Sequence, residues 1–558
     1  MRYYSLKIVL GALLCVAIPM GLAAQESKRV EVTTIYTPEV TLTSKLLPPA
    51  TIDENQAIEP EIEYSVRPDT WQLELESHNF KPATAGYWDF DRANRNHLRI
   101  SAGYPWASDV AYHFLSQNVR LGYFGLALDH RGSFSPRANA DGVVRSIADS
   151  YDTQNHFSLN GGVVAGRQTF EASLDYDFSI YNSYAKLQSA ERLYFNDAEL
   201  KLRYGDSFVD LSRLNFGVEL HGGGWLHTPP SATDVVRRLP EFRAGGSVRL
   251  AREWSSNVVG LTAEYDMWHS TMGSYRDMRF GAAVEYARDF GLLDVEASVG
   301  YLYDRVRGME SASHYILPKL HLGFDFGIDA LSPYIDLRSS VSQNSLSQLY
   351  NENPFIDYYA SSDMLAKMPN TLSYNLAIGL SGVAFSSRLS YNIAVTANVM
   401  REQTLWYISQ IGLFGVDAGD NNRFGVTADV EYRPIGSLVL GARFYAHADN
   451  SNGDYVADDA RVGGDFRIKY THKCITLYLL GEYTGVRRWS AVDADGNIVY
   501  EAFNSSGNLD LRAGIGLRIS RGFELYADGY NLLNSRIYDL AYYYRNGIGF
   551  MAGVRIDF

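Results

Sequence analysis

Apolar and polar residues alternate along the chain in one segment after another. The segment 461–470, RVGGDFRIKY, sets charged residues against apolar ones at every second position, and segments 197–204, 424–433 and 509–519 repeat the pattern. Successive side chains of a strand point to opposite faces, so a period of two predicts β-strands with one apolar and one polar face. With no credible helix between these segments, the pattern predicts an all-β chain.

The composition of the two faces favours a membrane barrel over a soluble sandwich, whose strands also alternate. The polar face combines Gly and Ala with charged residues and offers no second bulky core, while the apolar face often ends in Tyr, Phe or Trp, as an interface girdle requires. Short turns alternate with long polar loops. The short turns lie at 204–208, 289–292, 385–387, 433–436 and 520–522. We therefore predict a transmembrane antiparallel up-and-down β-barrel of about 22 strands.

Two regions leave the strand count open. Residues 105–133 fit either one long bulged strand or two strands, and 70–79 fits a first strand. Further along, 388–403 and 423–434 are predicted as strands of ordinary length. The last segment, IGFMAGVRIDF, ends with Phe558 on its apolar face. A terminal aromatic there resembles the signal read by the outer-membrane assembly machinery.

The first residues predict export from the cytoplasm. Arg2 and Lys7 precede a short apolar run, and small residues follow at Ala23 and Ala24, so residues 1–24 are predicted to be a signal peptide. Residues 25–69 are rich in Pro, Glu and Thr, which predicts an extended periplasmic segment. The barrel is then expected over 70–558, in the outer membrane of a Gram-negative cell.

Composition excludes several other classes of protein. The 558 residues include 64 acidic and 50 basic ones, a net charge of −14, which argues against a nucleic-acid partner. Two Cys form neither a disulfide scaffold nor a Cys-rich metal site, and we expect no cofactor or metal. The 12 His are scattered without a Ser or acid at a catalytic spacing, so no enzyme is predicted. The 40 Tyr fit the two interface girdles of a barrel.

Charged residues on the polar faces are the candidate functional residues. They would line a channel or solute site and set its charge selectivity, or they would pair into ladders that hold a wide barrel open. Either role requires them to face inward, because charge on the lipid face costs about 2–4 kcal/mol per residue at the membrane midplane. The candidates are Arg243, Arg249, Arg279, Glu285, Arg461, Asp465, Arg467, Lys469, Arg512, Arg518 and Arg555.

Two loops carry further candidate chemistry. The loop 447–460 concentrates Asp and Asn, which are ligands that suit Ca²⁺, but its spacing matches no EF-hand and a solvated loop is the favoured interpretation. The tip 540–547 holds three consecutive tyrosines, Tyr542, Tyr543 and Tyr544. They would form either part of the interface girdle, which we favour, or a stacking platform for a ligand.

The two ends of the chain resemble those of a known family. GYNLLNSRIYD (529–539) resembles the aromatic-Asn-Leu-hydrophobic-Asn-x-x-Tyr segment before the last strand of TonB-dependent receptors. RVEVTTIYTPEV (29–40) is similar to the Val-Thr-x-x-x-Thr-Pro stretch that opens many of these receptors. The tyrosine-rich composition resembles such barrels from Bacteroidota-like bacteria. The resemblance implies a receptor-type barrel, although residues 25–69 are too few for the family's plug domain, and this departure puts TonB-energised import in question.

Three functions remain open on the sequence. The resemblance favours passage of a solute or nutrient across the outer membrane. The barrel would alternatively be a structural or accessory subunit of an outer-membrane complex, with residues 25–69 binding a periplasmic or outer-membrane protein, or a passive porin. The other expected partners are outer-membrane lipid and the assembly machinery.

Overall fold

The computed structural model describes residues 95–558 apart from 119–121, 188, 231–237, 271–274, 307, 453–458, 494 and 496. In this part of the chain a single sheet of 24 strands dominates, and 22 of them form a closed antiparallel ring. The ring closes because the first strand pairs with the last, with Leu98 opposite Ile556 and Tyr104 opposite Phe550. The predicted barrel and its strand number are confirmed.

The ring strands follow one another in chain order. They are β1 Asn96–Tyr104, β2 Ala107–Asn118, β3 Gly122–Ser133, β4 Asp152–Ala165, β5 Gln168–Asn182, β6 Arg192–Asp206, β7 Asn215–His227, β8 Leu239–Trp254, β9 Asn257–Ser270, β10 Tyr275–Asp289, β11 Leu293–Arg305, β12 Ser313–Phe324, β13 Ser332–Ser342, β14 Thr371–Ala384, β15 Leu389–Gln410, β16 Leu413–Ile435, β17 Leu438–Asn452, β18 Val462–His472, β19 Ile475–Thr484, β22 Asn508–Ser520, β23 Phe523–Tyr530 and β26 Gly549–Asp557.

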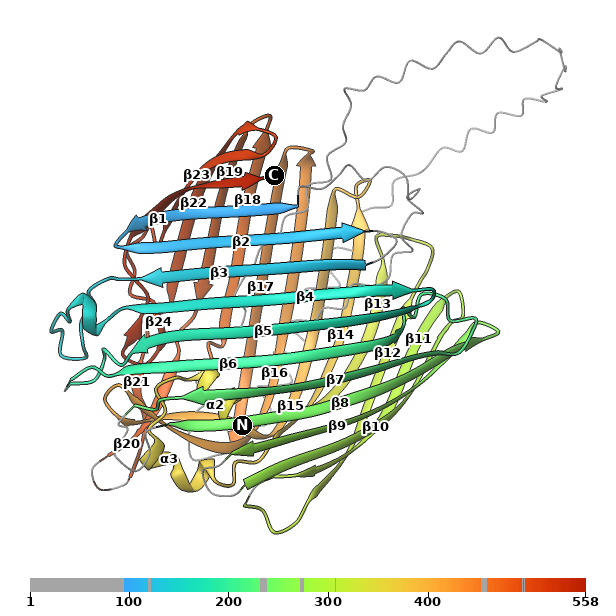
Figure 1. Ribbon diagram of the computed structural model, residues 1–558, viewed down its shortest axis with the longest axis horizontal. Coiled ribbons are helices and arrows are strands. Elements are labelled where there is room, and N and C mark those ends of the chain that lie inside the picture. The colour runs from blue at the N-terminus through green and yellow to red at the C-terminus, as the bar shows by residue number, and fades with distance from the viewer. Residues whose placement is uncertain are drawn as a thin grey trace, which may run out of the picture. The chain divides into compact units, whose positions relative to one another are not determined.

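Smaller elements occupy the long connections. They are η2 Ile147–Asp149, α2 Leu346–Glu352, α3 Tyr358–Leu365, the hairpin of β20 Arg488–Val492 and β21 Ile498–Asn504, and the short pair β24 Tyr538–Leu540 and β25 Tyr543–Tyr544. Figure 1 shows α2, α3, β20, β21 and β24 gathered at one end of the strands. We call this the loop end and the opposite one the turn end. No helix in the described residues is long and apolar enough to cross a membrane.

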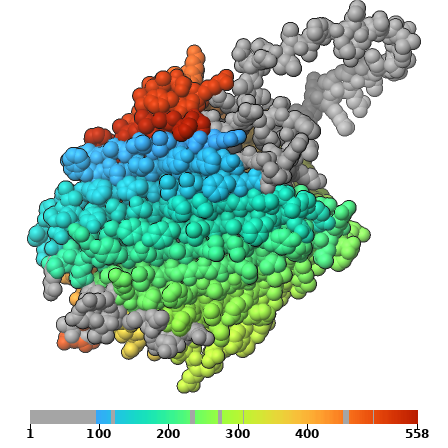
Figure 2. Space-filling model, viewed as in Figure 1, coloured from blue at the N-terminus to red at the C-terminus, as the bar shows by residue number. Residues whose placement is uncertain are grey.

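Alternation gives the wall an apolar outer face. On β10, Phe280 and Val284 are about half exposed, while Glu285 and Arg279 occupy the intervening positions. Side chains of the second set reach over strands to non-adjacent neighbours, as when the Nη2 of Arg279 on β10 donates to the carbonyl oxygen of Val341 on β13. Such contacts lie on the concave side of the ring, which is the lumen. Figure 2 shows the strands from β1 onward as parallel bands in chain order across one outer face.

The structure changes three details of the predicted strands. Residues 105–133 form two strands, β2 and β3, and β2 pairs with β1 along its length. Strands β15 and β16 run beyond the predicted ends, pairing as far as Gln410 and Leu413 past a bulge between Met400 and Gln403. The ring closes without residues 70–79, which, like the predicted signal peptide 1–24 and the segment 25–69, lie outside the described residues.

Candidate functional site: the lumen and its capped loop end

Side chains from loops and strand ends form one hydrophobic cluster at the loop end, which we call the cap. Its strand-borne members come from β6 to β8 and from β15 and β16, and its other members from the connections 183–191, 343–370, 485–507 and 531–548. These strands lie in separate sectors of the ring, so a cluster that joins them spans the loop end of the lumen. The buried members are Tyr184, Ala185, Leu193, Phe195, Trp225, Leu239, Leu346, Leu349, Tyr350, Phe355, Ile356, Leu365, Met368, Trp406, Ile408, Phe414, Val416, Trp489, Ala541 and Tyr543.

Tyr543 on β25 joins three separate connections of the cap. Its ring stacks on that of Phe355 with centroids 3.7 Å apart and meets the ring of Tyr184 edge-on at 5.0 Å. Its hydroxyl donates to the carbonyl oxygen of Gly412, in the turn between β15 and β16, at 2.8 Å. The residue is 5% exposed. Removing this one side chain therefore removes contacts to loops that belong to different sectors of the ring.

The connection between β13 and β14 is held by a buried carboxylate and by strand-like bonds. Glu241, 2% exposed on the lumen face of β8, accepts from the backbone N–H of Leu346 at 2.8 Å and from the Ser347 hydroxyl at 2.6 Å. These contacts satisfy free donors at the start of α2. On the other side, the N–H of Phe414 donates to the carbonyl oxygen of Phe355 at 3.0 Å. The α2–α3 connection is thus fixed to β8 and to β16.

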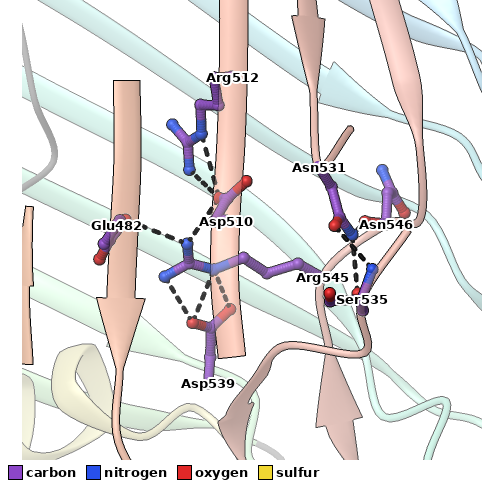
Figure 3. Close-up of polar contacts among 8 residues, drawn as sticks. All are labelled: Glu482, Asp510, Arg512, Asn531, Ser535, Asp539, Arg545 and Asn546. Atoms are coloured by element: carbon purple, nitrogen blue, oxygen red, sulfur yellow. Dashed lines mark hydrogen bonds and ion pairs between the residues drawn. The ribbon is translucent and has the colours of Figure 1, made fainter. Parts of the chain in front are cut away.

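The connection between β23 and β26, which carries Tyr543, is tied down at its base (Figure 3). Asn531 takes a positive φ of 45°, and its amide donates to the carbonyl oxygens of Ser535 and Asn546, each at 2.8 Å. Asn534 also takes a positive φ, of 51°, and its side-chain oxygen accepts from the N–H of Ile548 at 3.0 Å. Asn tolerates this left-handed conformation better than most residues. The two Asn positions of the receptor-like segment therefore have a structural explanation here.

Arg545 links the same connection to the wall. Its guanidinium lies 2.9 Å from the Asp539 carboxylate in its own loop, 3.3 Å from Asp510 on β22 and 3.6 Å from Glu482 on β19. Burial alone would lower the pKa of this guanidinium, but the three carboxylates raise it above its ordinary value. Arg545 therefore stays charged and holds the loop against two strands.

Burial determines the ionisation of the cap tyrosines. It raises the pKa values of Tyr184, Tyr350 and Tyr543 above the ordinary value of 10.0. All three hydroxyls are neutral at physiological pH. The ionised form of each is incompatible with the closed cap, because a buried phenolate loses its hydration.

The charged candidates lie where their alternation placed them, on the lumen side, and most are paired there. Arg243 lies 3.0 Å from Asp197, Arg249 lies 2.9 Å from Glu285, and Arg555 lies 2.7 Å from Glu524. Further partners are Glu431 for Arg467, Asp510 for Arg512, Asp449 for Arg461 and the Val341 carbonyl oxygen for Arg279. Asp465 and Lys469 lie on β18 and Arg518 on β22. This pairing favours the ladder role, and the lining of a passage stays a prediction.

Histidines contribute to these ladders in a way the sequence did not indicate. His97 lies 2.6 Å from Asp557, and His156 lies 2.8 Å from Asp177. His113 with Asp129 and His221 with Asp266 repeat the pair at 3.0 and 2.9 Å. The partners are on neighbouring or next-neighbouring strands, so only the strand register, which a scattered His count does not give, would have revealed them.

Two sequence interpretations of the loops are changed. Tyr542, Tyr543 and Tyr544 do not form a girdle: Tyr543 lies inside the cap and its two neighbours pack against it. The acidic loop is partly outside the described residues, but Asp449 and Asp459 both pair with Arg423. Among the described residues, no group of three or more His, Cys, Asp or Glu could hold a metal ion.

The last residue fits the ring closure. Phe558 is 59% exposed, and its backbone N–H and carbonyl oxygen pair with those of Asn96 at 3.0 and 2.9 Å. Its role in assembly stays a prediction.

No model of a known family matches the chain, and no curated protein matches its sequence. Solved structures do match. The chain is similar to the copper transporter OprC, with TM-score 0.61 and 14% identity over 84% of this chain and 82% of that one. It is similar to the FrpB iron transporter from Neisseria meningitidis, F5-1 variant, with TM-score 0.67 and 10% identity over the same shares. The ferric-catecholate import receptor Fiu from K12 E. coli matches with TM-score 0.59 and 10% identity, again over 84% and 82%. At this identity the likeness shows the fold alone, and it confirms the predicted antiparallel β-barrel.

Proposed function

We propose that the chain is an outer-membrane barrel that passes a solute inward through a lumen whose external mouth is closed by the cap. The observation that carries this proposal is the meeting of four connections from separate sectors of the ring around Tyr543. A passive porin needs a permanently open lumen, whereas the cap lies across the loop end and would have to move before a solute could enter there. The names of the similar structures, transporters of copper and iron and an import receptor, support the uptake direction.

The proposal includes the location and the roles predicted for the parts of the chain. Residues 1–24 would be removed on export, 25–69 would lie in the periplasm, and the barrel would start after residue 69. The lumen charges, led by pairs such as Arg243–Asp197 and Arg249–Glu285, would line the passage. Fractionation of cells that express the full chain, with N-terminal sequencing of the membrane-bound form, tests location and cleavage together.

Conductance in planar bilayers tests the passage itself. The full-length barrel is expected to insert without a stable conductance, and a variant in which Gly-Ser-Gly replaces residues 343–369 is expected to conduct. A wide stable pore in the unmodified protein would instead identify a passive porin. If neither protein conducts although both are verified to insert, a passage through the lumen is contradicted and an accessory subunit is favoured. In that case a stoichiometric partner should co-purify in mild detergent.

Energy coupling is tested by deletion of residues 25–69. If the stretch 29–40 couples the barrel to TonB, the deletion abolishes uptake that depends on the proton-motive force and leaves the conductance of the loop-deleted variant unchanged. Uptake that survives loss of the proton-motive force would exclude energised import.

A further inference from the structure

Among the described residues, two arginines on the outer face of β8 and β10 have no acidic partner. Arg252 shares its face with Phe242 and Val248, which are exposed, and Arg288 shares its face with the exposed Val284. Arginines on the lumen face of the same strand, such as Arg249, are paired with carboxylates. Within the described residues neither Arg252 nor Arg288 forms an ion pair, and the Nε atom of each is buried without a hydrogen-bond partner.

Aromatic rings and one amide hold both guanidinium groups in place. The guanidinium of Arg252 lies over the Trp254 ring at 5.0 Å, and that of Arg288 lies over the Phe290 ring at 4.5 Å. Arg288 also donates through Nη1 to the side-chain oxygen of Asn257 at 3.1 Å. Each guanidinium has five N–H donors, so most donors of this pair are left for a ligand.

Strand register brings the two arginines to the same part of the wall. Arg252 lies opposite Val259 of β9, and Val259 lies opposite Tyr286 of β10, two residues before Arg288. With strands about 4.8 Å apart and a rise of about 3.3 Å per residue, their Cα atoms are about 12 Å apart. Two long arginine side chains at that spacing can contact a single phosphate group.

An apolar groove of about 580 Å³ lies on the outer face next to the arginines, on their loop-end side. It begins at the nearest outward-facing residues in that direction. The row Leu250, Leu261 and Val284 lies two residues along each strand from the row of Arg252, Val259 and Tyr286, about 7 Å away. The groove is hollow because Ala263 and Ala282 are small. The lining of the groove includes Val248, Leu250, Leu261, Ala263, Val284 and Ile316.

We propose that this face binds one anionic phospholipid, with its phosphate between Arg252 and Arg288 and an acyl chain in the groove. The inference rests on the proposed membrane location, which places the turn end at the periplasmic surface. Arginine binds phosphate oxygens with two parallel hydrogen bonds, which accounts for the unused donors. Arginine on the lipid face costs about 0–1 kcal/mol near the interface, and the bound phosphate offsets that cost. Charge and groove together fit an amphiphile rather than a free anion.

Lipid binding to the purified full-length barrel in detergent tests the proposal. Native mass spectrometry with added phosphatidylglycerol is expected to show one tightly bound lipid, and the double variant Arg252→Gln/Arg288→Gln is expected to weaken it about tenfold or more. The matched control is Arg249→Gln, which removes the same charge from the lumen face of the same strand. Equal binding by the double variant, or equal loss in the control, would overturn the proposal. Heat-modifiable migration in gels verifies that each variant is folded.

Further experiments distinguish the contribution of the lipid headgroup from that of the acyl chain. Ala263→Phe fills the groove and leaves both arginines, so it is expected to weaken phosphatidylglycerol binding without changing the fold. Inorganic phosphate is expected to compete poorly, and phosphatidylethanolamine, which has no net charge, is expected to bind less tightly. If phosphate competes as well as the lipid, or if Ala263→Phe has no effect, the groove does not hold a chain and the proposal fails. The bilayer conductance of the same variants reports on the proposed function separately, so the two failures are distinguishable.

Discussion

At the scale of single residues, Tyr543 is the side chain on which closure of the mouth depends. Substitution by Ala removes its stacking on Phe355, its edge contact with Tyr184 and its hydrogen bond to Gly412. Loss of a buried aromatic side chain costs about 3–5 kcal/mol. We expect Tyr543→Ala to conduct in planar bilayers and to make cells susceptible to large hydrophilic antibiotics.

Two substitutions serve as controls for Tyr543→Ala. Tyr543→Phe keeps the stacking and loses one hydrogen bond, at about 1 kcal/mol, so it should stay closed. Tyr500→Ala removes a tyrosine that is 61% exposed on β21 and should behave as the unmodified protein. If the Tyr543→Ala protein conducts no more than these two variants, other contacts suffice to close the mouth.

At the scale of elements, α2 depends on a carboxylate that its own sequence does not contain. Glu241 on β8 accepts from the first N–H groups of this seven-residue helix. Glu241→Gln leaves the shape and removes the charge, which costs about 1–2 kcal/mol at a helix N-terminus. We expect limited proteolysis within 343–370 to accelerate about 5–30-fold.

A neighbouring carboxylate supplies the control for that measurement. Glu253 lies near the turn end of β8 and its side chain is exposed, so Glu253→Gln should leave the cleavage rate unchanged. Cleavage that is equally slow in both variants would mean that α2 is held by packing of Leu349 and Tyr350 alone.

The elements of the cap should also separate at high pH. Burial raises the pKa values of Tyr184, Tyr350 and Tyr543 above 10.0, so the closed cap retains protons that the open loops release. Closure is therefore fully stable below about pH 10 and weakens as the pH rises beyond it. We expect conductance to rise above pH 10, and Tyr543→Phe, with one ionisable group fewer, to open at a higher pH. Opening between pH 6 and 9 would contradict this origin.

At the scale of the whole molecule, the wall was predictable and the cap was not. Lipid and lumen impose opposite demands on successive residues of one strand, so alternation such as that of 461–470 is visible locally. The strand β2 was less clear because Pro105 and the polar residues of 107–118 blur the pattern. The cap joins Tyr184, Phe355 and Tyr543, which are far apart in the chain. Nothing near Tyr542–Tyr544 indicates those partners.

The sector of the lumen formed by β3, β5 and β6 is expected to attract cations in the opened barrel. On the lumen face of β3, β5 and β6, carboxylates outnumber basic groups. The carboxylates are Asp129, Glu171, Asp175, Asp177, Asp197 and Glu199, and the basic groups are Arg131, Lys201 and Arg203. Acidic lining attracts cations and repels anions, most strongly at low salt, where the screening length is about 30 Å at 0.01 M. In the Tyr543→Ala protein, the reversal potential under a KCl gradient should therefore indicate that cations pass more readily.

Two neutral variants in that same background test the cause of the preference. Asp175→Asn/Asp177→Asn removes charge from the lumen face of β5 and should shift the reversal potential toward zero. Asp210→Asn removes charge from the exposed turn between β6 and β7 and should leave it unchanged, because that turn lies outside the lumen. The change in reversal potential caused by Asp175→Asn/Asp177→Asn should be smaller at high salt, because salt screens the interaction between the permeating ion and the charged wall. An anion preference, or an equal shift from Asp210→Asn, would mean that the ion path does not follow this face of the lumen.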